Sequence, residues 1–206
     1  MNARLDAFRP VPPARPATVR RPDVGDAAWH GLHRDGVLVP LWGDLARVVD
    51  AAETPGLRAA ALAAVMPARS VLARAAAAWV HTGTGRPARA EVYVRPGARH
   101  GGPHPRRVVH ESTVAPEHVV LVGGVPVTSL ARTAADVARW LPDAAARSLL
   151  PALRDGGLDP DEAVRVLDGQ RGRHLVVART RLAALRDADA GTVRPGSAAP
   201  APPSTR

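Results

Sequence analysis

Two residue types are missing from this chain of 206 residues, which contains neither cysteine nor lysine. Without cysteine, the chain has no disulfides, no thiolate nucleophiles and no cysteine-ligated zinc or iron–sulfur sites. Without lysine, it has no P-loop lysine for phosphates, no protein-kinase strand lysine and no amine for Schiff-base chemistry. These absences exclude several large enzyme classes before any motif is considered.

Aromatic residues and long apolar runs are also scarce. Aromatic residues make up 3% of the chain, so we do not expect platforms on which single-stranded bases stack. No apolar run is long enough for a membrane span, and the first twenty residues lack the continuous apolar stretch of a signal peptide. We therefore expect a cytoplasmic protein without a membrane partner.

Arginine supplies all 28 basic residues, against 19 acidic ones, for a formal charge of +9. Together with abundant alanine, glycine and proline, this bias fits a GC-rich genome as well as a functional choice. Clustered arginines neutralise phosphates and release counterions, so nucleic acid is the first expected class of partner. The chain length suits one ordinary domain, or one domain with a small module and tails.

Composition divides the chain into four parts. Residues 1–22 hold five prolines and five arginines with almost no apolar periodicity, which predicts a disordered basic arm. Residues 23–50 predict a partial winged helix, and residues 51–187 a larger domain with helices, a small sheet and a C-terminal helical region. Residues 188–206 are rich in proline and alanine and predict a disordered tail. The expected fold class is α+β.

The partial winged helix is predicted from two neighbouring elements. A short helix over residues 23–36 ends at Gly36, and a hairpin follows around the Gly43–Asp44 turn. Pro40 confines its strand to a sheet edge because it has no backbone N–H. A helix followed by a hairpin is the second half of a winged helix. Only the arm precedes it here, so we expect a degenerate module.

The larger domain shows both helical and strand periodicities. Its helices often begin with a proline that follows a capping residue, as at Thr54–Pro55 and Asp159–Pro160. We predict helices over residues 54–67, 70–83, 143–155, 159–169 and 173–187, and strand-like runs at residues 90–94, 106–113 and 118–129.

No spacing in the chain marks a catalytic or cofactor site. Residue counts alone do not exclude a Ser/His/Asp arrangement, but there is no G-x-S-x-G elbow and no G-x-G-x-x-G dinucleotide motif. Three histidine patterns lack a third metal ligand at useful spacing; they are His30-x-x-His33, His100-x-x-x-His104 and His110-Glu111. We expect no catalytic residues, no metal and no cofactor.

The stretch "VPVTSLARTAADVARW", residues 125–140, carries the most informative pattern. Its helical periodicity puts apolar side chains on one side and Arg132, Asp136 and Arg139 on the other. One interpretation is a solvated face whose Arg–Asp pair contributes about 0.3 kcal/mol. The other is a clamp that holds a neighbouring helix or meets a partner. Spacing by itself favours the solvated face.

Several segments together resemble the actinobacterial branch of the AbiEi-type antitoxin family of type IV toxin–antitoxin systems. They are "GVLVPLWGDLARV", "LRAAALAAVMPARSVLARAAAAWVHTG", the strand pair after them and "GVPVTSLARTAADVAR". The most specific element is similar to the family signature T-S-x-x-R-T-x-x-D, and its residues here are Thr128, Ser129, Arg132, Thr133 and Asp136. The resemblance covers about residues 23–187.

The resemblance implies a winged helix that binds DNA and represses its own operon, and a larger part that counteracts a nucleotidyltransferase-type toxin. It implies no catalysis and no cofactor. On this basis the signature residues are expected to be structural clamp residues of the fold. The expected contacts to double-stranded DNA are Arg20 and Arg21 on the arm, Arg34 at the helix end and Arg47 on the hairpin. We expect them to contact phosphates more than bases.

Two alternatives remain beside a DNA-binding antitoxin or regulator. The first is a protein-interaction domain that has lost DNA binding together with the missing helices. The second is the remnant of a relative fused to a Vsr-like endonuclease domain. The metal site of that domain needs acidic residues and usually a lysine, which this chain lacks.

Overall fold

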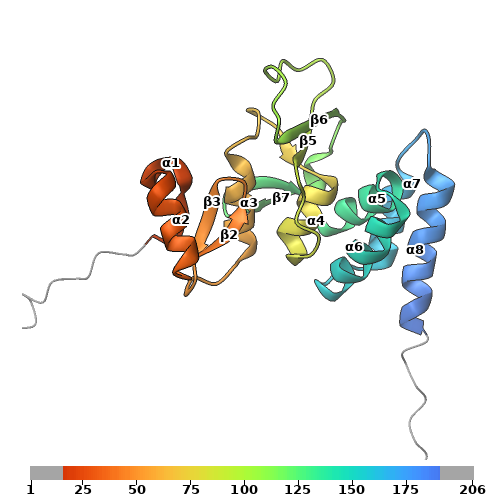
Figure 1. Cartoon of the computed structure of the whole chain (residues 1–206). Helices are drawn as coiled ribbons and strands as arrows, with labels where there is room; N and C mark the ends of the chain where they lie inside the picture. Colours follow the sequence, from red (N-terminus) through yellow and green to blue (C-terminus); the bar gives the residue numbers. More distant parts are fainter. Residues whose placement is uncertain (1–15, 191–206) are drawn as a thin grey trace, which may run out of the picture. The chain divides into compact units, whose positions relative to one another are not determined.

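The computed structural model describes residues 16–190, which belong to two compact units that divide between Thr54 and Pro55 (Figure 1). The sequence predicted the division between residues 50 and 51. Both units combine helices with small sheets, so the predicted α+β class is confirmed.

The first unit has the element order of a winged helix from its first strand onward. Its elements are β1 (Thr18–Arg20), α1 (Arg21–Val24), α2 (Asp26–Arg34), β2 (Leu38–Trp42) and β3 (Leu45–Val48). Gly25 separates the two helices with a positive φ of 77°, which glycine adopts without steric cost. The strands form an antiparallel sheet in the order β1-β3-β2. Two short helices therefore precede the hairpin, where the sequence predicted a single helix over residues 23–36.

A small apolar core holds the first unit together. Trp29 of α2 is buried with Leu38 and Ala46 of the hairpin strands, and Val19, Leu32 and Val48 pack around them. Pro40 lies in β2, an edge strand, as its missing N–H predicted. The predicted hairpin around Gly43–Asp44 is present.

The prediction of a disordered arm over residues 1–22 is wrong for its last residues. Residues 18–20 form β1, which pairs with β3 through Thr18↔Arg47 and Arg20↔Leu45, and α1 starts at Arg21. The order comes from backbone pairing with a strand some 25 residues away, so the local composition carries no sign of it. Residues 1–15 lie outside the described part of the chain. So does most of the predicted tail, although α8 continues to Ala190.

The second unit contains a five-stranded mixed sheet and six helices in its described residues, besides a 3-10 turn at Pro116–His118. Its strands are β4 (Val71–Leu72), β5 (Ala90–Val94), β6 (Arg107–Glu111), β7 (Val119–Val122) and β8 (Val125–Thr128), in the order β6-β5-β4-β8-β7. Its helices are α3 (Pro55–Ala63), α4 (Arg74–Thr82), α5 (Leu130–Trp140), α6 (Asp143–Asp155), α7 (Pro160–Asp168) and α8 (Leu175–Ala190). The three predicted strand-like runs are confirmed.

One strand of the second unit was predicted as helix. Val71 and Leu72 form β4, which pairs with β5 on one side and with β8 on the other. Two apolar residues at the head of an alanine-rich run give no strand signal. Their pairing with two longer strands decides their conformation.

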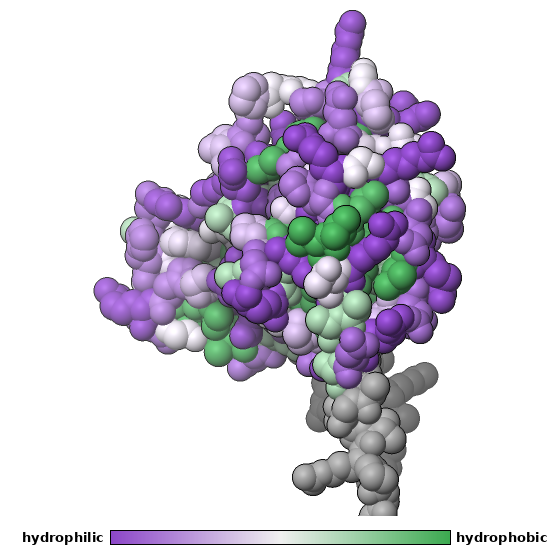
Figure 2. Space-filling model, turned by 90° about the vertical axis from the view of Figure 1, so that its right-hand side faces the viewer, coloured by the Kyte–Doolittle hydropathy of each residue, from purple (hydrophilic) through white to green (hydrophobic). Residues whose placement is uncertain are grey.

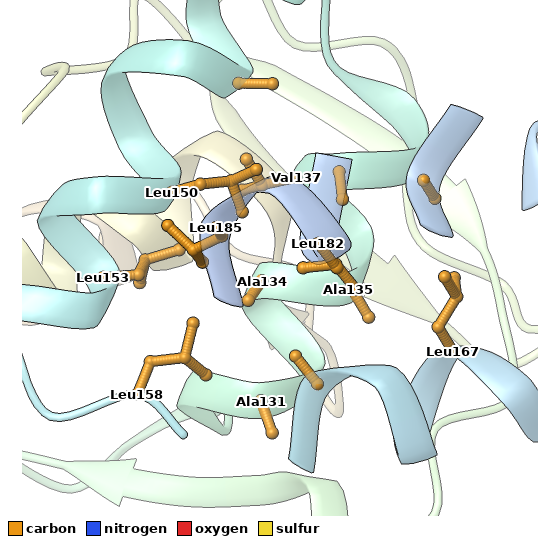
Figure 3. Close-up of a cluster of buried hydrophobic side chains, with 14 of the residues drawn as sticks. Ala131, Ala134, Ala135, Val137, Leu150, Leu153, Leu158, Leu167, Leu182 and Leu185 are labelled. Carbon is orange, nitrogen blue, oxygen red and sulfur yellow. The ribbon is translucent and has the colours of Figure 1, made fainter. Parts of the chain in front are cut away.

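Helix α5 is the buried centre of the helical part. Every residue from Ala131 to Arg139 is buried. Figure 3 shows its small residues, including Ala131 and Ala134, among leucines of the surrounding helices. Alanine lets the neighbouring helices approach α5 closely, and α6, α7 and α8 contribute large side chains to the core. These include Leu150, Leu153, Leu167, Leu182 and Leu185.

The surface seen in Figure 2 is mostly hydrophilic, with hydrophobic side chains exposed in patches. Val176 and Val177 of α8 are among the large hydrophobic residues that are exposed. Within residues 16–190, no helix has both the length and the apolar character needed to cross a membrane.

Candidate functional site

Helix α2 of the first unit has one side packed on the sheet and one exposed side. Trp29 and Leu32 turn toward the sheet, whereas Ala27, Ala28 and His30 are exposed. Short side chains allow a helix backbone to come close to another surface, such as a DNA groove. The helix also ends at the exposed Arg34, and β2 follows after a short turn. This side of α2 is therefore the candidate nucleic-acid interface.

The structure separates the four predicted DNA-contacting arginines into two kinds. Arg20 is exposed, and within residues 16–190 Arg34 makes a 3.4 Å contact with Asp35 beside it. Arg21, in contrast, donates a 2.8 Å hydrogen bond from Nε to Asp26. Arg47 is turned back on its own chain, because its Nη1 lies 3.4, 3.0 and 2.8 Å from the carbonyl oxygens of residues 48, 49 and 51. Arg47 thus secures the chain after the hairpin.

The charge of the chain is unevenly divided. Residues 1–54 contain seven arginines and seven acidic residues, so this part has no formal excess. Residues 55–206 contain twenty-one arginines and twelve acidic residues and carry the whole excess of +9. Contact between the first unit and DNA would therefore depend on a few arginines.

Three signature residues join the end of β8 to the first turn of α5. Ser129 caps the helix, since its Oγ accepts a hydrogen bond of 3.3 Å from the backbone N–H of Arg132. The hydroxyl of Thr133 donates to the carbonyl oxygen of Thr128 at 3.1 Å, and the two threonine hydroxyls are 2.7 Å apart. Both threonines are fully buried, so this hydrogen bonding leaves no polar group of theirs unpaired.

The other two signature residues form a buried ion pair. The Nε of Arg132 lies 3.1 and 3.0 Å from the two carboxylate oxygens of Asp136, and the side chains are 9% and 0% exposed. The guanidinium also donates to Ser112 at 3.4 Å and lies 5.4 Å from the ring centre of Tyr93. The solvated-face interpretation is therefore wrong. The pair faces β5 and the segment after β6, where mutual neutralisation and the aromatic ring make burial tolerable.

Burial changes the proton affinities of two groups at this site. It raises the pKa of Asp136, against the charge of Arg132 and hydrogen bonds from Arg132 and Tyr93 that lower it. Burial also raises the pKa of Tyr93 to about 12, with a smaller contribution from the charge of Asp136. Tyr93 therefore stays a neutral hydrogen-bond donor across the physiological range.

A cavity of about 690 Å³ lies beside the charged side of α5. Arg74, at the start of α4, reaches it and donates from Nε to the Tyr93 hydroxyl at 3.3 Å. The Nη1 of Arg74 lies 3.1 Å from His110 Nε2 and 3.6 Å from Glu91. Arg139 and Trp140 of α5 line the same cavity.

Sequence reasoning did not connect Arg74 or Tyr93 with the signature residues. One signal was available for Tyr93, the only tyrosine of the chain, because it lies in an apolar strand where a buried hydroxyl needs a partner. Arg74 offered none, since its contact with a residue 19 positions away arises only from the pairing of β4 with β5.

The histidines of the candidate metal patterns have other surroundings. His110 lies 2.9 Å from Glu91 and near Arg74, and His104 accepts a hydrogen bond from the backbone of Arg106. In the part of the chain that the structure describes, no group of three histidine or acidic side chains is placed to hold a metal ion.

Comparisons with known proteins give little similarity. No family model matches the chain, and no curated protein matches it. Among solved structures, the chain is similar to the crystal structure of the RV2827C protein from Mycobacterium tuberculosis. The two are 20% identical with a TM-score of 0.42, over 84% of this chain and 72% of that chain. A likeness at this level does not define a shared function.

Proposed function

We propose that this chain is a non-enzymatic, DNA-binding transcriptional regulator of the antitoxin type, acting in a bacterial toxin–antitoxin or phage-defence system. The observation that carries the proposal is the arrangement of the first unit. Two short helices, α1 and α2, lead into a hairpin, and the three strands pair in the order β1-β3-β2. In such modules the second helix enters the major groove and the hairpin touches the flanking backbone.

The surface of α2 supports this role. Ala27 and Ala28 leave room for close approach to a groove, and Arg34 at the helix end is available for a phosphate. Arg20, in β1, is the other exposed arginine among the described residues of the first unit. Arg21 and Arg47 are weaker candidates, because both already bind groups of the first unit. Among the described residues of the first unit, we therefore infer that Arg20 and Arg34 contribute most to the salt dependence of DNA binding.

The signature residues have a different role in this proposal. Asp136 is fully buried and Arg132 nearly so, and a toxin docking on the surface could not reach the pair. We infer that Arg132 and Asp136 maintain the fold of the antitoxin-type domain. Any effect on a nucleotidyltransferase-type toxin would be exerted through other residues, or through control of its gene.

Fluorescence anisotropy with the full chain tests DNA binding. The probe is a duplex from the region upstream of its own gene, with a scrambled duplex of equal length as the control, at low and moderate salt. We expect tighter binding to the upstream duplex. Arg34→Ala and Arg20→Ala should each reduce the salt slope by about one.

Arg147→Ala is the matched control, because Arg147 is an exposed arginine of α6 in the second unit and its loss changes the charge equally. Equal binding to both duplexes, unchanged in Arg34→Ala, would contradict the proposal.

A protein-interaction domain is the second candidate, and the charge distribution favours it. The first unit has no formal excess of positive charge, and two of its four candidate arginines are held internally. A protein partner docked on apolar surface would bind with little dependence on salt, unlike DNA. The endonuclease-remnant alternative is checked by incubating the chain with magnesium and either duplex or single-stranded DNA, where we expect no cleavage.

A further inference from the structure

Arginine is the most frequent residue in the lining of the cavity beside α5. It lies within the second unit, and its volume of about 690 Å³ is in the range of small-molecule sites. Two glutamates line it together with five arginines, which are Arg74, Arg132, Arg139, Arg165 and Arg171. The lining therefore has a formal excess of positive charge, although Arg165 also lies 3.6 Å from Asp159.

The buried Arg132 and Arg139 and the half-buried Arg74 are not equally neutralised. Arg132 has Asp136 as a partner, and Arg74 lies 3.6 Å from a Glu91 oxygen. The guanidinium of Arg139 instead donates to three neutral oxygens. These are Oε1 of Gln170 at 2.6 Å and the carbonyl oxygens of Arg171 and Arg173 at 2.7 and 2.9 Å. The buried part of the site therefore holds one more guanidinium than it holds close carboxylates.

Charge burial at Arg139 has an energetic consequence. Arg139 is 9% exposed, and burial lowers its pKa, as do the charges of Arg132 and Arg74 nearby. The charge of Asp136 acts in the opposite sense. A buried charge without a counter-ion is costly, so a bound anion would stabilise this part of the fold.

The geometry favours an anion with several oxygen acceptors. The centre of the Trp140 ring lies 5.0 Å from Cζ of Arg74 and 4.5 Å from Cζ of Arg139. Cation–π contacts of this kind restrain both guanidiniums. The hydroxyls of Ser112 and Tyr93 add neutral hydrogen-bonding groups at the same cavity. Guanidinium forks bind the oxygens of carboxylates and phosphates in pairs, and several guanidiniums together suit the larger number of oxygens on a phosphate.

We propose that this cavity binds a small phosphorylated molecule, with a phosphate group near Arg74, Arg132 and Arg139 and the remainder toward the exposed Arg165 and Arg171. Duplex DNA is a poorer fit, because its phosphates stay at the protein surface and Arg132 and Arg139 are more than nine-tenths buried. The site belongs to the second unit alone and does not depend on the DNA-binding function proposed for the first.

Isothermal titration of the full chain with pyrophosphate, and separately with ATP, tests the site. We expect saturable binding of at least one of them at one site per chain. Arg171→Ala and Arg165→Ala should each weaken that binding about fivefold to tenfold. Both side chains are exposed, so these variants should fold, and unchanged circular dichroism would show it. Arg89→Ala, an exposed arginine that does not line the cavity, should bind like the parent chain.

Three results would overturn the proposal. The first is that neither pyrophosphate nor ATP binds at millimolar concentration. The second is that Arg165→Ala, Arg171→Ala and Arg89→Ala all bind alike, which would indicate diffuse attraction to the surface. The third is that duplex DNA or an acidic peptide displaces pyrophosphate, binds far more tightly than pyrophosphate does, and depends on Arg171 for binding. The cavity would then be a contact site for a macromolecule. Loss of sequence-specific DNA binding in the anisotropy assay would not affect any of these outcomes.

Discussion

Each unit of the molecule contains an Arg–Asp ion pair of ordinary length, and the two pairs differ in burial. Arg21 and Asp26 are 2.8 Å apart in the first unit, with side chains 39% and 73% exposed. Arg132 and Asp136 are 3.0 Å apart in the second unit, at 9% and 0%. Distance alone would rank them as equals. If one partner of the first pair is removed, water solvates the remaining charge. If one partner of the second pair is removed, the remaining charge is buried without water or a counter-ion.

The same contrast holds for the arginines in general. In the first unit the charge is balanced, and Arg20 and Arg34 are exposed. In the second unit the excess is large, and several guanidiniums are buried in specific contacts. Net charge in this chain therefore does not indicate which surface meets a polyanion. Local burial and pairing do.

Asp136→Asn should have the largest effect. The amide keeps the shape of the side chain but leaves the guanidinium of Arg132 buried without its counter-charge. We expect the free energy of unfolding of the second unit to fall by about 3–5 kcal/mol. Urea denaturation followed by tryptophan fluorescence measures it. A fall below about 1 kcal/mol would mean that water reaches the pair and that the contrast in burial does not matter.

Alkaline pH should produce the next largest effect, through Tyr93. Its pKa in the folded chain is about 12, above the ordinary 10.0, so the folded chain keeps a proton that the unfolded chain releases between these values. The stabilisation is complete below pH 10 and is lost as pH rises through 12, a change of about 2–3 kcal/mol. Because Tyr93 is the only tyrosine, phenolate absorbance reports its titration directly. A midpoint near 10 in the folded chain, or an equal loss in Tyr93→Phe, would refute this.

Arg47→Ala should destabilise the first unit by a smaller amount. The substitution removes hydrogen bonds to backbone carbonyls after β3, and we expect a loss of about 1–2 kcal/mol in its free energy of unfolding. Thermal unfolding followed by circular dichroism measures it. Arg34→Ala removes the same charge from an exposed position and is the control. Equal stability of the two variants would show that Arg47 is as available to DNA as Arg34.

Asp26→Asn should have the smallest effect of the four. Its partner Arg21 stays solvated after the substitution, so the denaturation curve of the first unit should coincide with that of the parent chain. A clear loss of stability would show that the exposed pair fixes α2 against α1. Exposure would then not explain the difference between the two ion pairs.

Local signals in the sequence predicted the elements whose conformation is decided locally. Pro40 marked an edge strand, Gly43–Asp44 a hairpin, and Asp159 a cap that accepts from the N–H of Asp161. The periodicity of α5 correctly separated its apolar and charged sides. It could not show that the charged side is buried too. Tyr93 of β5 and Arg74 of α4 lie against that side only because β4 pairs with β5 in the folded chain.

The missed elements were decided by distant pairing. β1 exists because β3 lies beside it, and β4 because β5 and β8 do. The signature residues were identified as a set, but the surroundings of Arg132 and Asp136 were not. A helical repeat carries no information on residues 40 positions away.

The proline in the hairpin also affects whether identical chains can associate through their sheet edges. An edge strand with a full row of N–H groups invites another chain to extend the sheet, which is the first step of β-type aggregation. β2 is such an edge strand, and Pro40 within it has no N–H to donate to a strand of another chain. On the opposite edge, β1 is only three residues long. The small sheet is therefore protected at both edges against growth from one molecule into the next.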